Sequence, residues 1–424
     1  MGKKDIICRG ENFGAEKSIS GRLQIINNLK ELRFVKKNCI VLFNNFDFKF
    51  DSLNVIVNLI NKGAASFIVF KISKTDHGCI AAKEMGLNFY QINKSNNKIL
   101  NYKDKIITLK ENQIYLGKKR LNNKKIKLDK LNTKHEIKIN IGFPSNKNYS
   151  KIFNACSGVG FSRIEFLLSK ILNNIHPHKY IEFIGNKNFS NEIADQIRPA
   201  LKVLKKQKKE FWIRTDDFSV EQLIKMEFGK NYETEEKISS TGYRGIRRSN
   251  KEKNILTPLL MAIKKLDSEG FKNIGIFPPM VNNILEYKKW VNILKEHKLS
   301  NIKKGLMVET PRAAIMIEEF LENIDFIIFG TNDLTSFLLA VDRNNLNIRH
   351  MFDENDPVVI KVISDVIKKC KSKNVKTFLS GPLTENKSTL KKLLSVGLTG
   401  VTINPDISTI NKVKKIIFEI EKKL

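Results

Sequence analysis

The sequence lacks paired cysteines, long apolar runs and a hydrophobic leader, and each absence excludes a class of protein. The five cysteines are scattered and form no CxxC pair, so we expect neither a disulfide framework nor a structural zinc site. No apolar stretch approaches the roughly 18 residues of a membrane span, and the opening MGKKDIICRGENFG has no apolar signal-peptide core. These absences favour a protein of the reducing cytoplasm that does not cross a membrane.

What the sequence has in excess is positive charge. There are 75 lysines and arginines against 44 acids, a formal net charge of +31, and such a balance is typical of proteins that bind nucleic acid or an anionic membrane. The lysines, however, are spread along the whole chain among many asparagines and isoleucines, which resembles a compositional bias more than a basic groove. We therefore do not expect nucleic-acid binding. A small anionic substrate is the favoured partner for part of this charge.

The pattern along the chain divides it into two domains and a linker. The 424 residues, of which 41% are hydrophobic, are enough for two or three domains with a large core. Residues 1–120 alternate short β-like runs such as IVLF and SFIVF with polar turns and helix, and they predict a small α/β domain. The charge-rich stretch 118–136 has little apolar periodicity, so we predict a linker at 121–136 and a second domain at 137–424.

From residue 137 onward, strand and helix patterns alternate eight times. The expected strands lie at 137–143, 158–166, 211–217, 273–279, 305–310, 325–331, 375–381 and 400–406. The segments between them are amphipathic; over 312–324, one helical face would carry Ala313, Ile317, Phe320 and Ile324. Eight β/α units predict a C-terminal (β/α)8 TIM barrel, and an open doubly wound sheet is the alternative.

Two acids at neighbouring strand ends suggest a metal site. Glu309 ends the run GLMVET, and Asp333 follows the next run, DFIIFGT. Because strand C-termini of a barrel share one face, we expect the two acids to be neighbours there. Carboxylate oxygens completed by waters and a substrate phosphate are the ligands that Mg²⁺ prefers. The alternative for Asp333 is that it only caps the helix LTSFLLAV.

Four arginines lie at or just past the expected strand ends or in the segments that follow them: Arg163, Arg214, Arg244 and Arg343. The guanidinium fork binds phosphate and carboxylate oxygens with two parallel hydrogen bonds. Any one of these arginines taken alone is equally consistent with a surface ion pair. Together with the two acids and Asn332, they predict a cage for a metal-bound small molecule with several negative charges.

In the first domain, the segment SKTDHGCIAAKEMG places His77 at the start of a helix that Gly86 would end. Thr75 or Asp76 is a suitable cap for that helix. A helix N-terminus stabilises an anion through its free N–H groups and its dipole. His77 is therefore a candidate nucleophile toward phosphorus, the alternative being an ordinary exposed histidine near a cap.

These motifs together resemble the phosphoenolpyruvate-utilising enzymes, a family of phosphoenolpyruvate synthase, pyruvate phosphate dikinase and Enzyme I of the sugar phosphotransferase system. KTDHGCIAAKEMG is similar to the phosphohistidine segment of the family's swivelling domain. The stretches GVGFSRIEF and WIRTDDF are most similar to phosphoenolpyruvate synthase. MVETPRAA and GTNDLT…LLAVDR resemble segments specific to the family's barrel. The resemblance extends over nearly the whole chain.

The resemblance implies a phosphotransferase of the pyruvate, water dikinase type and gives each motif a role. His77 would carry the phosphoryl group. The phosphate of phosphoenolpyruvate would be held by three arginines, Arg163, Arg214 and Arg244. The cofactor Mg²⁺ would be held by Glu309 and Asp333. The substrate site would be completed by Asn332 and Arg343. A homodimer through the barrel is also implied.

The sequence departs from the family pattern in three places. Ser380 stands where the family has a cysteine that moves the proton at the methyl carbon of pyruvate, and a hydroxyl is a poor acid or base there. Ile72–Ser73 replaces a glycine pair before the histidine segment. No ATP-grasp domain or glycine-rich phosphate loop is found, so we expect a separate ATP-grasp subunit to phosphorylate His77. The alternatives are a diverged enzyme for another 2-oxo acid or enolpyruvate, and a phosphoenolpyruvate-binding sensor or scaffold.

Overall fold

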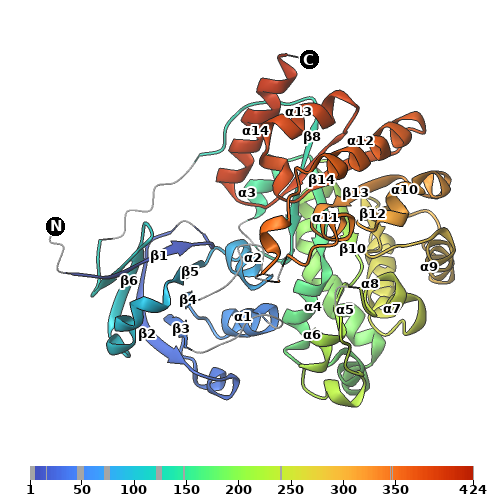
Figure 1. Cartoon of the computed structure of the whole chain (residues 1–424). Helices are drawn as coiled ribbons and strands as arrows, with labels where there is room; N and C mark the ends of the chain where they lie inside the picture. The colour runs from blue at the N-terminus through green and yellow to red at the C-terminus, as the bar shows by residue number, and fades with distance from the viewer. Residues whose placement is uncertain are drawn as a thin grey trace. The chain divides into compact units, whose positions relative to one another are not determined.

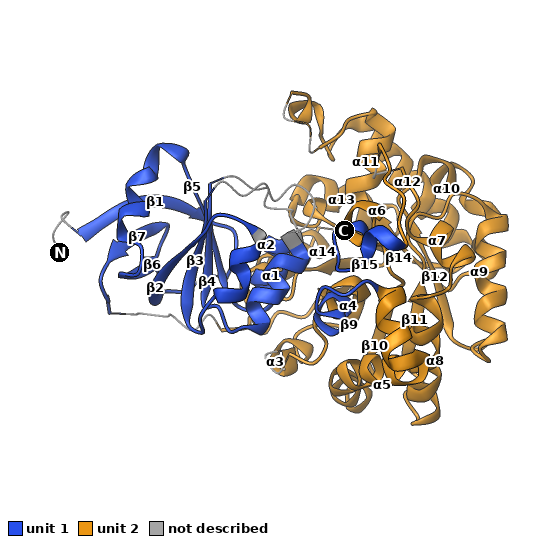
Figure 2. Ribbon diagram, turned by 90° about the horizontal axis from the view of Figure 1, so that it is seen from below, with its two compact units in different colours: residues 1–125, 168–176, 224–231 blue, residues 126–167, 177–223, 232–424 orange. Residues whose placement is uncertain are grey.

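The computed structural model describes residues 5–15, 17–44, 52–70, 77–120, 127–146, 149–238, 241–343, 345 and 347–423, without the side chains of Leu29, Ser52 and His77. The chain forms two compact units (Figure 2). The amino-terminal unit comprises residues 1–125, 168–176 and 224–231, and the barrel unit comprises 126–167, 177–223 and 232–424. Residues 118–120 and 127–135 contain no helix or strand.

The amino-terminal unit is a closed seven-stranded sheet with helices, which confirms the predicted small α/β domain. Around the sheet the strand order is β1-β5-β4-β3-β2-β6-β7. Neighbouring strands from β2 to β5 are parallel, and β1, β6 and β7 pair antiparallel. The strands are β1 (Ile6–Asn12), β2 (Ile19–Ile26), β3 (Cys39–Phe43), β4 (Ser66–Val69), β5 (Asn88–Ile92), β6 (Ile106–Lys110) and β7 (Gln113–Leu116). The helices are η2 (Leu29–Phe34), α1 (Ser52–Asn61), α2 (His77–Glu84) and η3 (Lys94–Tyr102).

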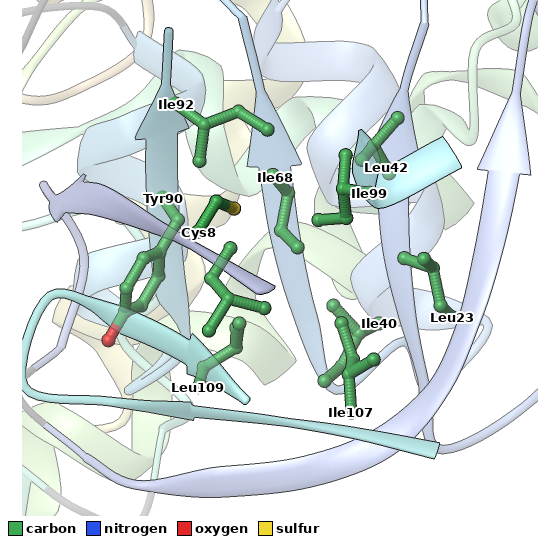
Figure 3. Close-up of a cluster of buried hydrophobic side chains, with 11 residues drawn as sticks. Cys8, Leu23, Ile40, Leu42, Ile68, Tyr90, Ile92, Ile99, Ile107 and Leu109 are labelled. Atoms are coloured by element: carbon green, nitrogen blue, oxygen red, sulfur yellow. The ribbon is translucent and has the colours of Figure 1, made fainter. Parts of the chain in front are cut away.

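The central parallel strands of this unit, β3 and β4, are buried on both faces. Every residue of β3 and β4 is buried, as expected for parallel strands covered on both sides. Figure 3 shows the core on one face, where Leu23, Ile40 and Ile68 gather with Tyr90 and other apolar side chains. Residues of opposite parity make a second packed layer, in which aromatic rings contact each other in pairs: Phe43 with Phe67, and Phe67 with Phe89.

The barrel unit contains eight parallel strands that close into a barrel (Figure 1). This confirms the predicted (β/α)8 fold and excludes the open sheet. The strands are β8 (Glu136–Ile141), β9 (Gly158–Arg163), β10 (Glu210–Arg214), β11 (Ile274–Phe277), β12 (Lys303–Val308), β13 (Phe326–Gly330), β14 (Lys376–Ser380) and β15 (Gly400–Ile403). Each lies where a strand was predicted, although the second is shorter than predicted because helix α4 begins at Ile164.

Helices surround the strands of the barrel, as Figure 1 shows for α5, α8, α9, α10, α12 and α13. The α-helices from Tyr149 onward are α3 (Tyr149–Phe153), α4 (Ile164–Leu172), α5 (Pro177–Lys206), α6 (Val220–Ile224), α7 (Ile246–Lys251), α8 (Leu256–Ser268), α9 (Ile284–Glu296), α10 (Pro311–Ile315), α11 (Thr331–Leu339), α12 (Pro357–Ser372), α13 (Lys387–Ser395) and α14 (Ile407–Glu421). The 3-10 helices in the same part of the chain are η4 (Gly229–Asn231), η5 (Ile317–Glu319), η6 (Leu321–Asn323), η7 (Arg349–Met351) and η8 (Pro382–Glu385). None of the helices in the described ranges is long and apolar enough to cross a membrane.

The single helix predicted over 312–324 is wrong. The structure divides that segment into the short helix α10 and the two 3-10 turns η5 and η6. Even so, Ala313, Ile317, Phe320 and Ile324 are all buried. A 3-10 turn repeats every three residues, so an apolar spacing of three and four residues is also satisfied by a broken helix. The pattern therefore predicted the buried residues correctly, but it wrongly predicted one continuous helix.

The inside of the barrel is filled mainly by aromatic rings. Its buried cluster consists of Phe161, Trp212, Phe277, Met307, Phe326, Ile328 and Phe378. Trp212 stacks on Phe326 with ring centroids 3.8 Å apart. Gly275 makes room for this stack, since a Cβ there would lie 2.6 Å from the indole ring. Side chains alternate along a strand, so the inward residue after Trp212 is Arg214, the one after Met307 is Glu309, and the one after Phe378 is Ser380.

Candidate functional site

The C-terminal ends of the strands bring most of the predicted site residues to one end of the barrel. Arg163, Arg214 and Ser380 are the last residues of β9, β10 and β14. Glu309 directly follows β12. Two further predicted residues, Asn332 and Asp333, lie in the first turn of α11, which begins where β13 ends. Parallel strands end on the same side, so the topology alone places these groups on one face.

Asp217 joins two of the arginines into one unit. Its carboxylate accepts hydrogen bonds from Arg244 Nε (2.8 Å) and Arg244 Nη2 (2.6 Å), and it lies 3.1 Å from Arg214 Nη1. Arg214 also forms an ion pair with Glu165. Burial acts to lower the pKa of Arg214, but the charges of Glu165 and Asp217 outweigh it and raise that pKa. Both guanidinium groups therefore stay charged in fixed positions.

Arg244 also reaches the predicted metal-binding acid. Its Nη2 lies 3.3 Å from Asp333 Oδ2. Burial acts to lower the pKa of Arg244, yet Asp217 and Asp333 raise it well above its ordinary value. The N-cap position of α11 is occupied by Gly330, without a side-chain cap. The alternative in which Asp333 merely caps this helix is therefore wrong, because its carboxylate faces Arg244.

Glu309 is a fully buried carboxyl group in an acid-rich environment. Its Oε1 accepts a hydrogen bond from the backbone N–H of Met280 at 2.6 Å. Gly330 allows it to lie against the end of β13, since a Cβ there would be 2.6 Å from Glu309 Oε2. Burial, followed by repulsion from Asp333 and Asp217, raises the pKa of Glu309 to about 8 against the opposing effect of the arginines. A cation beside Glu309 and Asp333 would relieve this repulsion.

The donor set here fits a hard cation that keeps open positions. Among the described residues, no group of three or more histidine, cysteine or acidic side chains is placed to hold a metal ion by itself. Glu309 and Asp333 offer two carboxylates, and Mg²⁺ commonly binds one or two carboxylates with waters and substrate phosphates as its other ligands.

Arg163 and Arg214 share one aromatic ring. Their guanidinium carbons lie 4.7 Å and 4.9 Å from the ring centroid of Phe161. A ring face attracts a guanidinium group by cation–π interaction, so Phe161 holds two positive charges near each other that would otherwise repel. Phe161 in turn packs edge-on against Phe277 in the barrel core.

Ser380 is buried in a polar network, and the structure determines which atoms of this network donate hydrogen bonds and which accept them. Asn140 Nδ2 lies 3.4 Å from the carbonyl oxygen of Thr402 and 3.5 Å from Ser380 Oγ, while the Thr402 hydroxyl contacts Asn140 Oδ1. A carbonyl oxygen only accepts, so the amide nitrogen of Asn140 must face it. The same nitrogen then faces Ser380 Oγ as a long, weak donor. Among the described residues, no basic group contacts this hydroxyl.

Arg343 and Asn332 complete the predicted set. Asn332 is half-buried in the first turn of α11, and Arg343 lies in the segment that follows that helix. Arg343 Nη1 is buried and has no hydrogen-bond partner within the described part of the chain. The same segment carries Glu354, whose Oε1 lies 2.7 Å from Thr331 Oγ1.

His77 belongs to the amino-terminal unit and is the first residue of α2. Gly86 follows this helix with φ of +72°, a conformation typical of glycine after a helix end. The side chain of His77 lies outside the described residues, as do Thr75, Asp76 and Ile72–Ser73. The proposed role of His77 therefore stays a prediction.

Sequence reasoning missed Asp217, Glu165, Phe161 and Glu354. A signal for the first two was present, since both acids lie within three residues of a strand-end arginine, in WIRTDD and GFSRIEF. Nothing in the sequence indicated Phe161 or Glu354, because Arg214, the second arginine over Phe161, and Thr331, the partner of Glu354, come from other elements of the fold.

Fold and site together define a (β/α)8 barrel protein whose strand ends carry clustered arginines and acids. Residues 118–422 match the family described as "PEP-utilising enzyme, PEP-binding domain". The chain belongs to this family of phosphoenolpyruvate-utilising enzymes.

Among its relatives, the probable phosphoenolpyruvate synthase of Archaeoglobus fulgidus is 30% identical over 429 residues, which cover 99% of this chain and 55% of that protein. The phosphoenolpyruvate synthase of Helicobacter pylori is 28% identical over 456 residues, again 99% and 55%. That of Pyrococcus furiosus is 32% identical over 292 residues, 68% of this chain and 35% of that protein. The chain thus spans about half the length of the first and second of these relatives, and about a third of the last.

Proposed function

We propose that this chain transfers a phosphoryl group between His77 and pyruvate or phosphoenolpyruvate, with Mg²⁺, as the pyruvate-side part of a phosphoenolpyruvate synthase-like system. In this proposal, residues 1–120 are a swivelling phosphohistidine domain, 121–136 a linker and 137–424 the substrate barrel. A separate ATP-grasp chain phosphorylates His77, and the barrel forms a homodimer. The similarity to phosphoenolpyruvate synthases over nearly the whole chain supports the reaction type.

One observation carries the proposal for the barrel: two of its arginines keep buried donors without acceptors. Arg214 Nε and Arg343 Nη1 have no hydrogen-bond partner among the described residues. A buried donor without an acceptor costs on the order of 1–3 kcal/mol, and more when it is charged. Phosphate and carboxylate oxygens of phosphoenolpyruvate are acceptors of the right charge. The cost is thus offset when such a ligand binds.

In this proposal the chain's own residues do most of the positioning. Arg163, Arg214 and Arg244 hold the phosphate, with Phe161 and Asp217 fixing the guanidinium groups that they contact. Asn332 and Arg343 complete the substrate contacts. Glu309 and Asp333 would hold Mg²⁺, which when bound supplies positive charge to the enolate and phosphate oxygens. The Met280 N–H and Arg244 keep those two carboxylates in place.

The transfer itself exchanges two bonds to phosphorus. In the direction of synthesis, the bond from phosphorus to the His77 ring breaks while a bond forms to the enolate oxygen of pyruvate. Before this, a proton must leave the methyl carbon of pyruvate. Ser380 is the residue implied for that step. Among the described residues, however, no basic group lies within hydrogen-bond distance of its hydroxyl to accept the proton.

The direct test is labelling from phosphoenolpyruvate. The purified chain is incubated with Mg²⁺ and phosphoenolpyruvate labelled on phosphorus, beside a His77→Ala variant. We expect acid-labile, base-stable label on the wild type and none on the variant. No label, with phosphoenolpyruvate binding still measurable by calorimetry, would sink the split-synthase proposal and leave another substrate or a sensor.

A second candidate, a diverged enzyme for another 2-oxo acid or enolpyruvate, is favoured by the network around Ser380. Its weak hydrogen bond from Asn140 makes the hydroxyl an acceptor there, and a serine without a base is poor at moving a carbon-bound proton. General acid–base catalysis contributes about 10²–10⁴-fold. If pyruvate is the substrate, Ser380→Cys should speed the exchange of labelled pyruvate into phosphoenolpyruvate about a hundredfold. Unchanged exchange would favour the diverged enzyme.

A further inference from the structure

The hydroxyl of Thr331 is a junction between three segments of the proposed site. It lies 2.7 Å from Glu354 Oε1 and 3.0 Å from the carbonyl oxygen of Ser380. Thr331 directly precedes Asn332 and Asp333, Ser380 ends β14, and Glu354 belongs to the segment that also carries Arg343. Gly381, with φ of +105°, permits this close packing, because a side chain there would collide with Thr331 Oγ1.

Counting protons at this junction limits the states that it can adopt. A hydroxyl has one hydrogen, and the Ser380 carbonyl can only accept. If Thr331 donates to that carbonyl, then Glu354 must carry a proton and donate to Thr331. If Glu354 is ionised, the hydroxyl hydrogen turns to the carboxylate, and the carbonyl of Ser380 loses this donor.

Burial is the largest effect on the pKa of Glu354, and it acts toward the neutral acid. Glu354 is buried, and burial raises its pKa. The hydrogen bond from Thr331 and the charge of Arg343 oppose this effect, while Asp353 adds to it. Thr331, Arg343 and Asp353 are thus the hydrogen-bonding and charged groups that act on the pKa of Glu354. An ionised Glu354 would also attract Arg343, whose Nη1 has no hydrogen-bond partner there.

We propose that Glu354 is a further positioning residue: as a neutral acid it donates to Thr331, keeps Thr331 bonded to the Ser380 carbonyl, and leaves Arg343 available for an anionic oxygen of the substrate. This inference rests on the proposed function, because it takes phosphoenolpyruvate as the ligand of Arg343. It assigns no bond-making step to Glu354, which acts through Thr331 and Arg343.

The test measures the affinity for phosphoenolpyruvate with Mg²⁺ by calorimetry from pH 4.5, the ordinary pKa of a glutamate, to pH 9, in a His77→Ala background that prevents transfer. Glu354→Gln reproduces the neutral acid, since its amide nitrogen donates to Thr331. We expect Glu354→Gln to bind phosphoenolpyruvate as tightly as the chain with Glu354 does at low pH. At high pH the chain with Glu354 should lose affinity, whereas Glu354→Gln should keep it. Compared with Glu354→Gln, Thr331→Val should bind roughly tenfold more weakly at all pH values, because it loses the hydrogen bond to the Ser380 carbonyl. Glu354→Ala should also bind more weakly than Glu354→Gln, because Thr331 loses its donor, and this difference should not change with pH. Thr331→Ser should restore binding.

The matched control is Asp353→Asn, which removes a neighbouring exposed charge without touching Thr331 and should leave the affinity at low pH unchanged. The substrate phosphate and Glu309 titrate in every variant, so the difference between glutamate and glutamine isolates Glu354. The inference is overturned if Glu354→Gln binds as weakly as Glu354→Ala, or if its affinity has the same pH profile as that of the chain with Glu354. Either result leaves the proposed function standing. If the glutamate chain does not bind phosphoenolpyruvate at any pH, the proposed function fails and this inference falls with it.

Discussion

The two ends of the barrel both carry buried charge, but they use it in opposite ways. At the amino-terminal end, Lys138 lies 2.8 Å from Glu210 and 3.3 Å from Glu136. Lys303 pairs with the same Glu210 at 2.5 Å, and Lys376 pairs with Glu136 at 2.7 Å. Every acid in this group has two lysines. At the carboxyl-terminal end, acids lie close to other acids, and Arg214 Nε and Arg343 Nη1 have no hydrogen-bond partner among the residues that the structure describes.

The pKa values of two glutamates, Glu210 and Glu309, show how the two ends of the barrel differ. Burial acts to raise the pKa of Glu210, but Lys138 and Lys303 lower it to about 2. Burial together with the nearby carboxylates Asp333 and Asp217 raises the pKa of Glu309 to about 8. One end thus has its charges satisfied within the chain and contributes to stability. The other end is left incomplete, and a ligand and a cation would complete it.

The largest effect on phosphoryl transfer is expected from replacing Arg244 at the carboxyl-terminal end of the barrel. Arg244→Met leaves Asp217 and Asp333 without the guanidinium group that holds both. Loss of one positioned donor in a site of this kind costs on the order of 10²–10³ in rate. We expect transfer of label from phosphoenolpyruvate to fall at least a hundredfold, with the melting temperature as a check on folding. Transfer within tenfold of the wild type would remove Arg244 from the site.

The next effect should fall on stability alone, at the other end of the same barrel. Lys138 is fully buried, and its ammonium group lies 4.0 Å from the ring centroid of Trp212. Removing one partner of a buried ion pair costs about 3–5 kcal/mol. We expect Lys138→Met to lose about 3 kcal/mol in urea unfolding at pH 7, because Lys303 still offsets part of the charge of Glu210. The affinity for phosphoenolpyruvate should not change.

This stability difference has a defined pH dependence. The folded-state pKa of Glu210 is depressed from 4.5 to about 2. Its contribution is therefore present above the unfolded pKa and is lost as the pH falls through the folded value. The wild type and Lys138→Met should converge in stability between pH 4.5 and pH 2. Curves that run parallel over this window would show that Lys138 stabilises through packing and not through its charge.

An effect of the opposite sign on stability is expected at Glu309. A group whose folded pKa is raised supports stability below its unfolded pKa, and that support is lost as the pH rises through the folded value. At pH 9 without Mg²⁺, Glu309→Gln should therefore be more stable to urea than the wild type, by up to about 5 kcal/mol, since the pKa is raised from 4.5 to about 8 and each pKa unit is worth about 1.4 kcal/mol. Below pH 4.5 the two should be equal. A variant less stable than the wild type at pH 9 would contradict the picture of a strained, incomplete site.

The same contrast explains what the sequence predicted and what it did not. All eight barrel strands were predictable because each contains a mostly buried stretch rich in apolar residues, as FIIFG and GVTI show. The first strand of the amino-terminal unit, IICRGEN, was missed because burial along it is mixed. Arg214, Glu309 and Asp333 were predictable from the rule that strand ends meet. The ion pairs of Asp217 and the junction at Thr331 were not, because they depend on side-chain geometry between distant segments.

The smallest expected effect on stability concerns the exposed lysine at the amino-terminal end of the barrel, Lys303, which can be compared with the buried Lys138. Glu210 has two lysine partners, of which Lys138 is 1% exposed and Lys303 is 54% exposed. Exposed ion pairs contribute about 0–1 kcal/mol, because water and salt screen them. Lys303→Met should therefore cost less than about 1 kcal/mol in urea, and that loss should disappear in 1 M salt, whereas the loss in Lys138→Met should persist. Equal losses in the two variants would mean that burial does not decide the strength of this charge group, and the stabilising role assigned to the amino-terminal end would then rest on Glu210 alone.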